Sequence, residues 1–198
     1  MDTPYLLYID AAVRPQSRTR QLCSRYLSVF AQLHPNVQIR RRTLADMQLS
    51  PKTAAALERI DALLAQGRTE SECFAYAREF AQADRILIGA PYWDFSFPAL
   101  LKLYIENICM SGITFTYEND RPKGLCRAQR LVYITTAGGS TAGFDLGSEY
   151  VCKLCSGLLG ISRCRTLAID MLDIIGTDTA ALMENGFLAA ERLAHEEQ

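Results

Sequence analysis

The chain has 198 residues, 49% of them hydrophobic and 22% charged, a composition typical of a globular domain with a full core. A formal net charge of −1 gives no sign of a nucleic-acid or membrane-surface partner, and no apolar run approaches the roughly 20 residues that span a bilayer. The opening MDTPYLLYID lacks the basic start and small-residue cleavage site of a secretory signal, so we expect one cytoplasmic domain over residues 1–198.

Strand and helix patterns alternate from the N-terminus onward. Tyr5–Asp10 has the pattern of a buried strand, and Ser17 can cap the amphipathic helix that continues through LCSRYLSVFAQL. Val37–Thr43 predicts the second strand. Ser50-Pro51 then predicts a helix start, with proline at its favoured first position, and Gly67 predicts the end of that helix.

The middle of the chain continues this alternation. The stretch TESE, residues 69–72, has the capping-box pattern ahead of a helix through FAYAREFAQA. Arg85–Ala90 predicts the third strand, and Pro98 begins a helix, ALLKLYIENICM, that ends before Gly112. In Ile113–Leu125 a Thr/Phe/Tyr alternation followed by a polar turn predicts a hairpin or an extended flap.

The last two strands are predicted at Arg130–Thr136 and Arg163–Ile169, with helices over about Leu146–Leu159 and Asp178–His195. The runs RILIGA and RLVYITT lack the polar alternation of a sheet that is exposed on one face. Five strand–helix repeats therefore predict a doubly wound α/β domain. We expect a five-stranded parallel sheet of flavodoxin-type order 2-1-3-4-5, with helices on both faces.

Seven cysteines are scattered along the chain. An odd, irregular set is more typical of reduced thiols in a cytosolic protein than of a disulfide framework. Cys152 and Cys155 have CxxC spacing, but they fall among apolar residues of a predicted helix, and no second pair is present to complete a zinc site. We expect no metal site and a buried structural role for this pair, with metal or redox use as the alternative.

Three loops follow strand ends at the sheet edge where such folds bind ligands: the first loop, DAAVRPQSRTR (10–20), the aromatic loop, PYWDFSFP (91–98), and the glycine loop, TAGGSTAGFD (136–145). In the first loop, unpaired N–H groups at the helix start and the hydroxyls of Ser17 and Thr19 can bind an anion. This loop contains no glycine, so it is neither a Walker A nor a GxGxxG motif. The alternative is a plain helix cap with solvated arginines.

The other two loops favour a flat ligand. The aromatic loop has four aromatic side chains within six residues: Tyr92, Trp93, Phe95 and Phe97. Aromatic walls can bury the rings of a conjugated ligand, although they can equally pack in the core or at a subunit interface. In the glycine loop, Gly138 and Gly139 allow close approach of the backbone to a ligand, and a flexible turn is the alternative.

A resemblance covers nearly the whole chain. APYWDFSFPALLKLYIENICMSGITFTYENDRPKGL, followed by TTAGG, resembles the FMN-dependent NAD(P)H:quinone oxidoreductase/azoreductase family of flavodoxin-like fold. The family has an AP-x-x-N-F loop, an AG-[VI]-TF-x-Y hairpin and a T-x-x-GG loop. The matching residues occur here in the same order: Ala90, Pro91, Phe95, Gly112, Thr114, Phe115, Tyr117, Gly124, Leu125, Thr135, Gly138 and Gly139. YVCKLCSGLLGI also resembles the family's Y-x-x-x-x-x-G-x-x-GI segment.

The resemblance implies an FMN cofactor, with NADH or NADPH as co-substrate. It implies that the start of the first helix holds the FMN phosphate, that the aromatic loop runs along the isoalloxazine ring and that the glycine loop closes the other side of the ring. The cofactor-binding residues implied in this way are Ala11, Ser17, Arg18, Thr19, Pro91, Tyr92, Trp93, Asp94, Phe95, Thr136, Ala137, Gly138 and Gly139. It also implies a homodimer with two active sites at its interface.

The sequence departs from the family pattern at three positions. Ala11 replaces a serine, and Arg14, Arg18 and Arg20 are candidates to supply charged donors in its place. Asp94 replaces the loop asparagine and would disfavour a reduced anionic flavin unless its carboxylate points away or is protonated. Ala137 replaces a polar residue of the T-x-x-GG loop.

The function implied is hydride transfer from NAD(P)H through flavin N5 to a quinone, azo or related electron-poor acceptor in a ping-pong cycle. Because the flavin carries this chemistry, we expect no catalytic side chain, and neither His34 nor His195 has the setting of a catalytic base. Trp93 is expected to contact the ring. Two alternatives stay open. One is a flavodoxin-type electron carrier, although the net charge and the first loop differ from those of a carrier, and the other is a non-catalytic flavin-binding or sensing protein.

Overall fold

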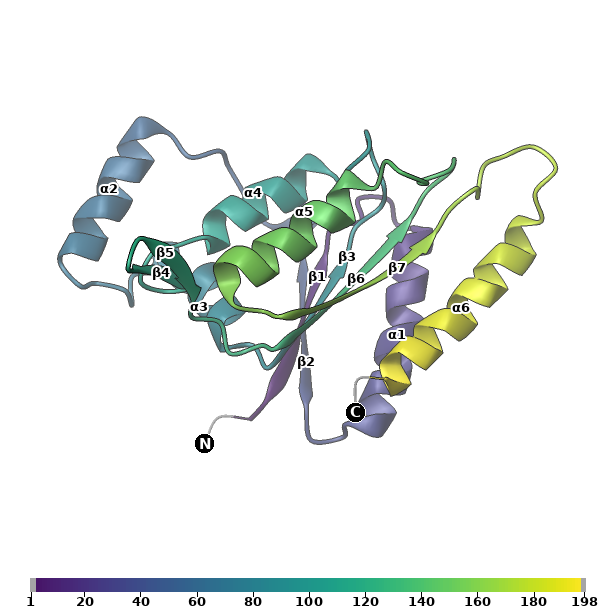
Figure 1. Ribbon diagram of the computed structural model, residues 1–198, viewed down its shortest axis with the longest axis horizontal. Coiled ribbons are helices and arrows are strands. Elements are labelled where there is room, and N and C mark those ends of the chain that lie inside the picture. Colours follow the sequence, from purple (N-terminus) through teal and green to yellow (C-terminus); the bar gives the residue numbers. More distant parts are fainter. Residues whose placement is uncertain (1–2, 197–198) are drawn as a thin grey trace.

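The computed structural model describes residues 3–196, and its centre is a five-stranded parallel sheet (Figure 1). The strand order β2-β1-β3-β6-β7 is the predicted 2-1-3-4-5 order, because the two intervening strand numbers belong to a separate hairpin. The strands of the sheet are β1 (Tyr5–Asp10), β2 (Gln38–Thr43), β3 (Arg85–Gly89), β6 (Arg130–Thr136) and β7 (Arg163–Ile169).

Helices cover both faces of the sheet (Figure 1). On one face lie α1 (Arg18–Leu33) and α6 (Thr179–His195), and on the other lie α3 (Ala75–Gln82), α4 (Ala99–Ile108) and α5 (Leu146–Leu154). Strand β1 shows why two layers form. Its Leu6 and Tyr8 side chains pack in the core with α1 and α6, whereas Leu7 and Ile9 pack in the core on the opposite face.

Two helices begin later than the sequence pattern predicts. Helix α2 (Ala54–Ala65) begins after Thr53, whose Oγ1 accepts from the Ala56 N–H at 3.2 Å, so Ser50-Pro51 is not its start. The predicted capping box at residues 69–72 does not form either, since no side-chain cap hydrogen bond is made at the described starts of the 3₁₀ turn and α3, and the Arg78 guanidinium binds the Thr69 and Ser71 carbonyls instead. A 3₁₀ turn, Glu72–Phe74, follows and precedes α3.

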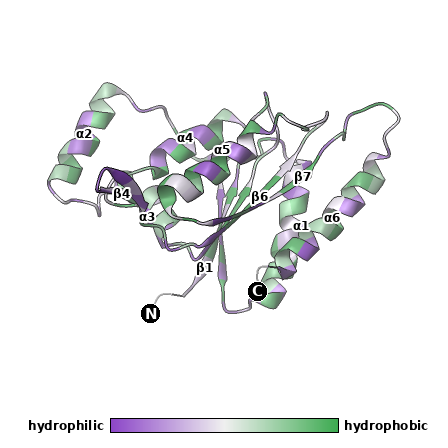
Figure 2. Ribbon diagram, in the orientation of Figure 1, coloured by the Kyte–Doolittle hydropathy of each residue, from purple (hydrophilic) through white to green (hydrophobic). Residues whose placement is uncertain are grey.

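The segment Ile113–Leu125 is a hairpin, as predicted, formed by β4 (Phe115–Glu118) and β5 (Arg121–Gly124). Both residues of its turn, Asn119 and Asp120, have positive φ, 52° and 61°, the pattern of a type I′ turn. Figure 2 shows a strongly hydrophilic segment in this hairpin, in keeping with the residues ENDRPK (118–123) at the end of β4, in the turn and in β5. The two strands of the hairpin therefore lie outside the main hydrophobic core.

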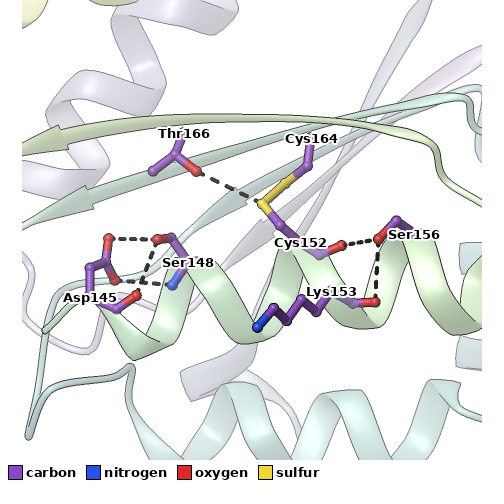
Figure 3. Close-up of a disulfide and its surroundings, with 7 residues drawn as sticks. All are labelled: Asp145, Ser148, Cys152, Lys153, Ser156, Cys164 and Thr166. Carbon is purple, nitrogen blue, oxygen red and sulfur yellow. Dashed lines mark hydrogen bonds between the residues drawn. A yellow bond between two sulfur atoms is a disulfide. The ribbon is translucent and has the colours of Figure 1, made fainter. Parts of the chain in front are cut away.

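The helix predicted over Leu146–Leu159 changes character part-way along. Helix α5 continues into a π-helical turn, Cys155–Leu159, which ends at Gly160 with φ 79°. Cys152 of α5 and Cys164 of β7 are joined by a disulfide (Figure 3). The expectation that all cysteines are reduced is therefore wrong, because the turn at Gly160 brings two residues 12 positions apart within bonding reach. Cys155 is buried and free, as the structural interpretation of the CxxC pair predicts, but that interpretation is wrong for Cys152, which is only partly buried and is disulfide-bonded.

Thiol labelling of the protein purified without reductant tests this pairing. We expect exposed Cys73 to react first in the native state, because burial raises the pKa of Cys23, Cys126 and Cys155 to about 12. Mass spectrometry after denaturation without reductant should then count five labels, and seven after reduction. Seven labels without reduction would contradict the disulfide.

Among residues 3–196, no helix combines the length and hydropathy that crossing a bilayer requires.

Candidate functional site

A cleft of about 260 Å³ opens at the carboxyl edge of the sheet, where the first, aromatic and glycine loops meet. Its lining includes most of the predicted cofactor-binding residues: Ser17, Arg18, Pro91, Tyr92, Trp93, Thr136, Ala137 and Gly138. Four further residues line it: Val13, Arg14, Gln16 and Asp173. The other predicted residues, Ala11, Thr19, Asp94, Phe95 and Gly139, do not line it.

The start of α1 presents free backbone donors beside this cleft. Ser17 caps the helix, and its Oγ accepts from the Arg20 N–H at 3.3 Å. Among residues 3–196, the N–H groups of Arg18 and Thr19 have no acceptor. The Thr19 hydroxyl is not free, because it is buried and shares a 2.7 Å hydrogen bond with Thr136 Oγ1. The Thr19 side chain therefore links α1 to β6, and only the backbone N–H of Thr19 is available beside the cleft.

Arg20 shapes the first loop, because four of its five guanidinium N–H donors bind Asp10 and carbonyl oxygens of this loop. Its main role is therefore structural, and the expectation that it supplies charged donors to an anion is corrected. Its Nε donates to Asp10 Oδ2 at 2.8 Å. Its two terminal nitrogens donate to the carbonyl oxygens of Ala12, Arg14 and Pro15 at 2.6, 3.0 and 3.1 Å. The fully buried Asp10 carboxylate also accepts from the Ala12 N–H at 3.0 Å. The Arg20 guanidinium thus holds the first loop in shape by binding carbonyl oxygens of its backbone.

The charges at the start of α1 are not those that stabilise the N-terminus of a helix. The first turn of α1 has no acidic residue, although acidic side chains are favoured at this positive end of the dipole. Asp10 compensates Arg20, and Asp173 pairs with Arg18 at 2.5 Å. The exposed Arg14 guanidinium has no partner in the described part of the chain. A local rule broken in this way is typical of a functional site.

The aromatic loop turns sharply at Asp94 and Phe95, whose φ angles are 50° and 63°. The turn is closed by Trp93 and Ser96, whose backbones exchange hydrogen bonds of 3.1 and 2.7 Å. Aspartate tolerates this left-handed conformation, but for phenylalanine it costs about 1–2 kcal/mol, and such strain clusters at functional sites. The Asp94 side chain is exposed and does not line the cleft.

Tyr92 and Trp93 form the aromatic wall of the cleft. The Tyr92 N–H donates to Thr136 O at 3.0 Å, and its hydroxyl donates to Phe144 O at 3.1 Å, so the aromatic loop is bound to the glycine loop. Desolvation raises the pKa of the Tyr92 phenol, which therefore stays a neutral donor at physiological pH. Trp93 is 41% exposed, which leaves its ring accessible from the cleft.

The glycine loop is fixed against the segment that follows β7. Gly138 O accepts from the Asp173 N–H at 2.9 Å, and a Cβ on Gly138 would lie 2.4 Å from Asp173 Oδ2. A side chain at position 138 would therefore displace the Asp173 carboxylate from its present place. Gly139, by contrast, has open space around it. Its N–H and that of Gly138 have no acceptor among residues 3–196.

Comparison with known proteins decides the family. The model of a family described as having a flavodoxin-like fold matches residues 5–192. The chain is 32% identical to FMN-dependent NADH:quinone oxidoreductase 2 of Clostridium acetobutylicum, over 96% of this chain and 98% of the relative. It is 33% identical to FMN-dependent NADH:quinone oxidoreductase of Lachnoclostridium phytofermentans, with the same coverage. The chain belongs to this flavodoxin-like oxidoreductase family.

Solved structures agree with this family's fold. An azoreductase from Bacillus anthracis superposes with a TM-score of 0.85 at 20% identity, covering 98% of this chain and 99% of the other. An FMN-dependent NADH-azoreductase from the same species, solved in complex with FMN, superposes with a TM-score of 0.84 at 19% identity and 98% coverage of both chains. At these identities the likeness concerns the fold alone.

Two departures from the family pattern lie away from the cleft. The Ala11 side chain is buried, and its N–H donates to Gly89 O at 2.9 Å. Asp94 is exposed outside the lining, and only Ala137 faces the cleft. Sequence reasoning missed Asp173, which lies 155 residues from its partner Arg18. Its position just beyond the carboxyl end of the fifth strand was the one signal available.

Proposed function

We propose that this chain is an FMN-dependent NADH:quinone oxidoreductase that acts as a homodimer. The curated relatives that share about a third of its residues carry this name. The observation that carries the proposal is that a helix start with free N–H groups and no acidic residue in its first turn meets an aromatic wall in one cleft. A phosphate ester joined to a flat ring system has these two properties.

The residues at the helix start fit a phosphate group. The free N–H groups of Arg18 and Thr19, the Ser17 hydroxyl and the unpaired Arg14 guanidinium would hold it. The helix dipole adds to the attraction, since no acidic residue in the first turn opposes it.

The other loops fit a planar ring. Trp93 and Tyr92 offer aromatic surface, and the Gly138 N–H, which has no acceptor among residues 3–196, is a donor for a polar ring edge. The Phe95 N–H, beside the cleft, likewise has no acceptor in the described part of the chain. The Asp94 carboxylate lies outside the lining, so its charge is directed toward solvent.

Bound FMN would supply two-electron chemistry, taking hydride at N5 from NADH or NADPH and giving it to a quinone, azo or other electron-poor acceptor in a ping-pong cycle. The chain's own part is to bind, orient and place charge. Neither histidine serves as a base in this site. His34 stacks on Phe30 at the far end of α1, 4.5 Å between ring centroids, and His195 ends α6.

Exposed apolar side chains beside the cleft support the homodimer. They lie in the aromatic loop and at the start of α5: Trp93, Phe95, Phe144, Leu146 and Tyr150. A partner subunit that covers this surface would wall the open side of the site.

The absorption spectrum of the purified protein tests the proposal. We expect bound flavin that is bleached at once by anaerobic NADH, followed by steady turnover of menadione or an azo dye. Slow reduction by NADH would favour the electron carrier, and binding without turnover would favour the sensing protein. A protein that stays colourless after FMN is added would overturn the flavin site itself.

A further inference from the structure

Asp173 is a carboxylate in a cleft built to attract an anion. It lies in the loop after β7 and lines the same cleft as Arg18 and Arg14. Its Oδ1 accepts from Arg18 Nη2 at 2.5 Å. A negative charge at this position repels a phosphate. If the cleft binds one, Asp173 must have a favourable effect that outweighs this repulsion.

The position of this carboxylate is fixed by backbone geometry. The Asp173 N–H is bound to Gly138 O at 2.9 Å, and Oδ2 lies against the Cα side of Gly138, where a Cβ would approach it to 2.4 Å. The backbone of Asp173 is therefore bound to the glycine loop, while its Oδ1 accepts from the guanidinium at the start of α1. Asp173 thus links the two walls of the cleft.

Stability alone does not account for the Arg18–Asp173 pair. The two side chains are 37% and 64% exposed, and ion pairs this accessible contribute about 0–1 kcal/mol to folding. The pair does restrict Arg18, a long side chain at a helix end whose dipole repels a cation. Only one terminal nitrogen is used by Asp173, so the other guanidinium donors stay available.

We propose that Asp173 is a positioning residue that holds the Arg18 guanidinium in place for the cofactor's phosphate, an inference that rests on the proposed function. The bound anion then meets a cation whose side-chain freedom is already restricted, which strengthens binding. Asp173 acts only through Arg18 and does not itself contact the phosphate. Its removal should therefore weaken FMN, although simple charge repulsion predicts the opposite.

Comparison of FMN with riboflavin, which lacks the phosphate, tests this role. Dissociation constants are measured by flavin fluorescence titration of the apoprotein. We expect Asp173→Asn to weaken FMN binding about tenfold, because an ion pair then no longer restrains the guanidinium that meets the phosphate, and to leave riboflavin binding unchanged. Arg18→Gln should weaken FMN at least as much, and the double variant should show no additional loss.

Asp61→Asn is the matched control, because it makes the same charge change on an exposed face of α2, at the opposite end of the molecule from α1 (Figure 1). It should leave both flavins unaffected. The inference is overturned if Asp173→Asn binds FMN as tightly as the parent or more tightly, or if it weakens both flavins equally. A parent protein that binds neither flavin would instead contradict the proposed function.

Discussion

Replacing Arg20 by methionine is expected to lower the free energy of unfolding by about 3 kcal/mol, because the fully buried Asp10 carboxylate then loses one of its two cationic partners. Arg41 stays bound to that carboxylate, which keeps the loss at the lower end of the range for a broken buried pair. Three carbonyl oxygens of the first loop also lose their donor. FMN and riboflavin should both bind more weakly, since the whole loop loses its shape.

Urea unfolding followed by circular dichroism measures this change, and Arg25→Met is its control. Arg25 lies on the same helix, but its pair with Glu191 is half-exposed, so we expect a change of at most about 0.5 kcal/mol. Equal effects of the two substitutions would show that Arg20 is an ordinary surface arginine.

Gly124→Ala is expected to destabilise the fold by about 3 kcal/mol and to lower Tm by about 10 °C. A Cβ at Gly124 would lie 2.0 Å from the Gly160 nitrogen and 2.1 Å from the Leu159 carbonyl carbon. Both are backbone atoms at the end of the π-helical turn, so no side chain can move aside to make room. Thermal unfolding by circular dichroism gives the shift directly.

Gly157→Ala provides the comparison for this variant. Gly157 lies in the same π-helical turn, and a Cβ there would meet nothing within 4 Å. Its Tm should be unchanged or slightly higher, because alanine is favoured over glycine in helical backbone. A Gly124→Ala protein as stable as the parent would mean that β5 and the π-helical turn separate easily. Gly124 belongs to the family pattern, and the structure explains it by close packing of two backbones.

The strands of the main sheet and the three ligand loops followed from local patterns. β3 and β6 are buried on both faces, so their unbroken apolar runs are visible without any tertiary contact. The loop positions followed because the carboxyl ends of parallel strands meet at one edge. Helix starts were harder to place. Both Ser50 and Thr53 have capping side chains, and local sequence does not rank them.

The sequence by itself determined the α/β alternation and the loops at the carboxyl ends of the strands, since both depend on hydrophobic periodicity and on the geometry of parallel crossovers. The strand order was predicted correctly, but from the flavodoxin-type pattern and not from periodicity. Only the tertiary structure decided which polar groups are free at the cleft and which are bound within the protein. Arg20 closes its own loop, Thr19 bonds to Thr136, and Arg18 meets Asp173 from 155 residues away. The same holds for the Cys152–Cys164 bond. A side chain's hydrogen-bond partner depends on which distant segments fold beside it, and no local pattern records that.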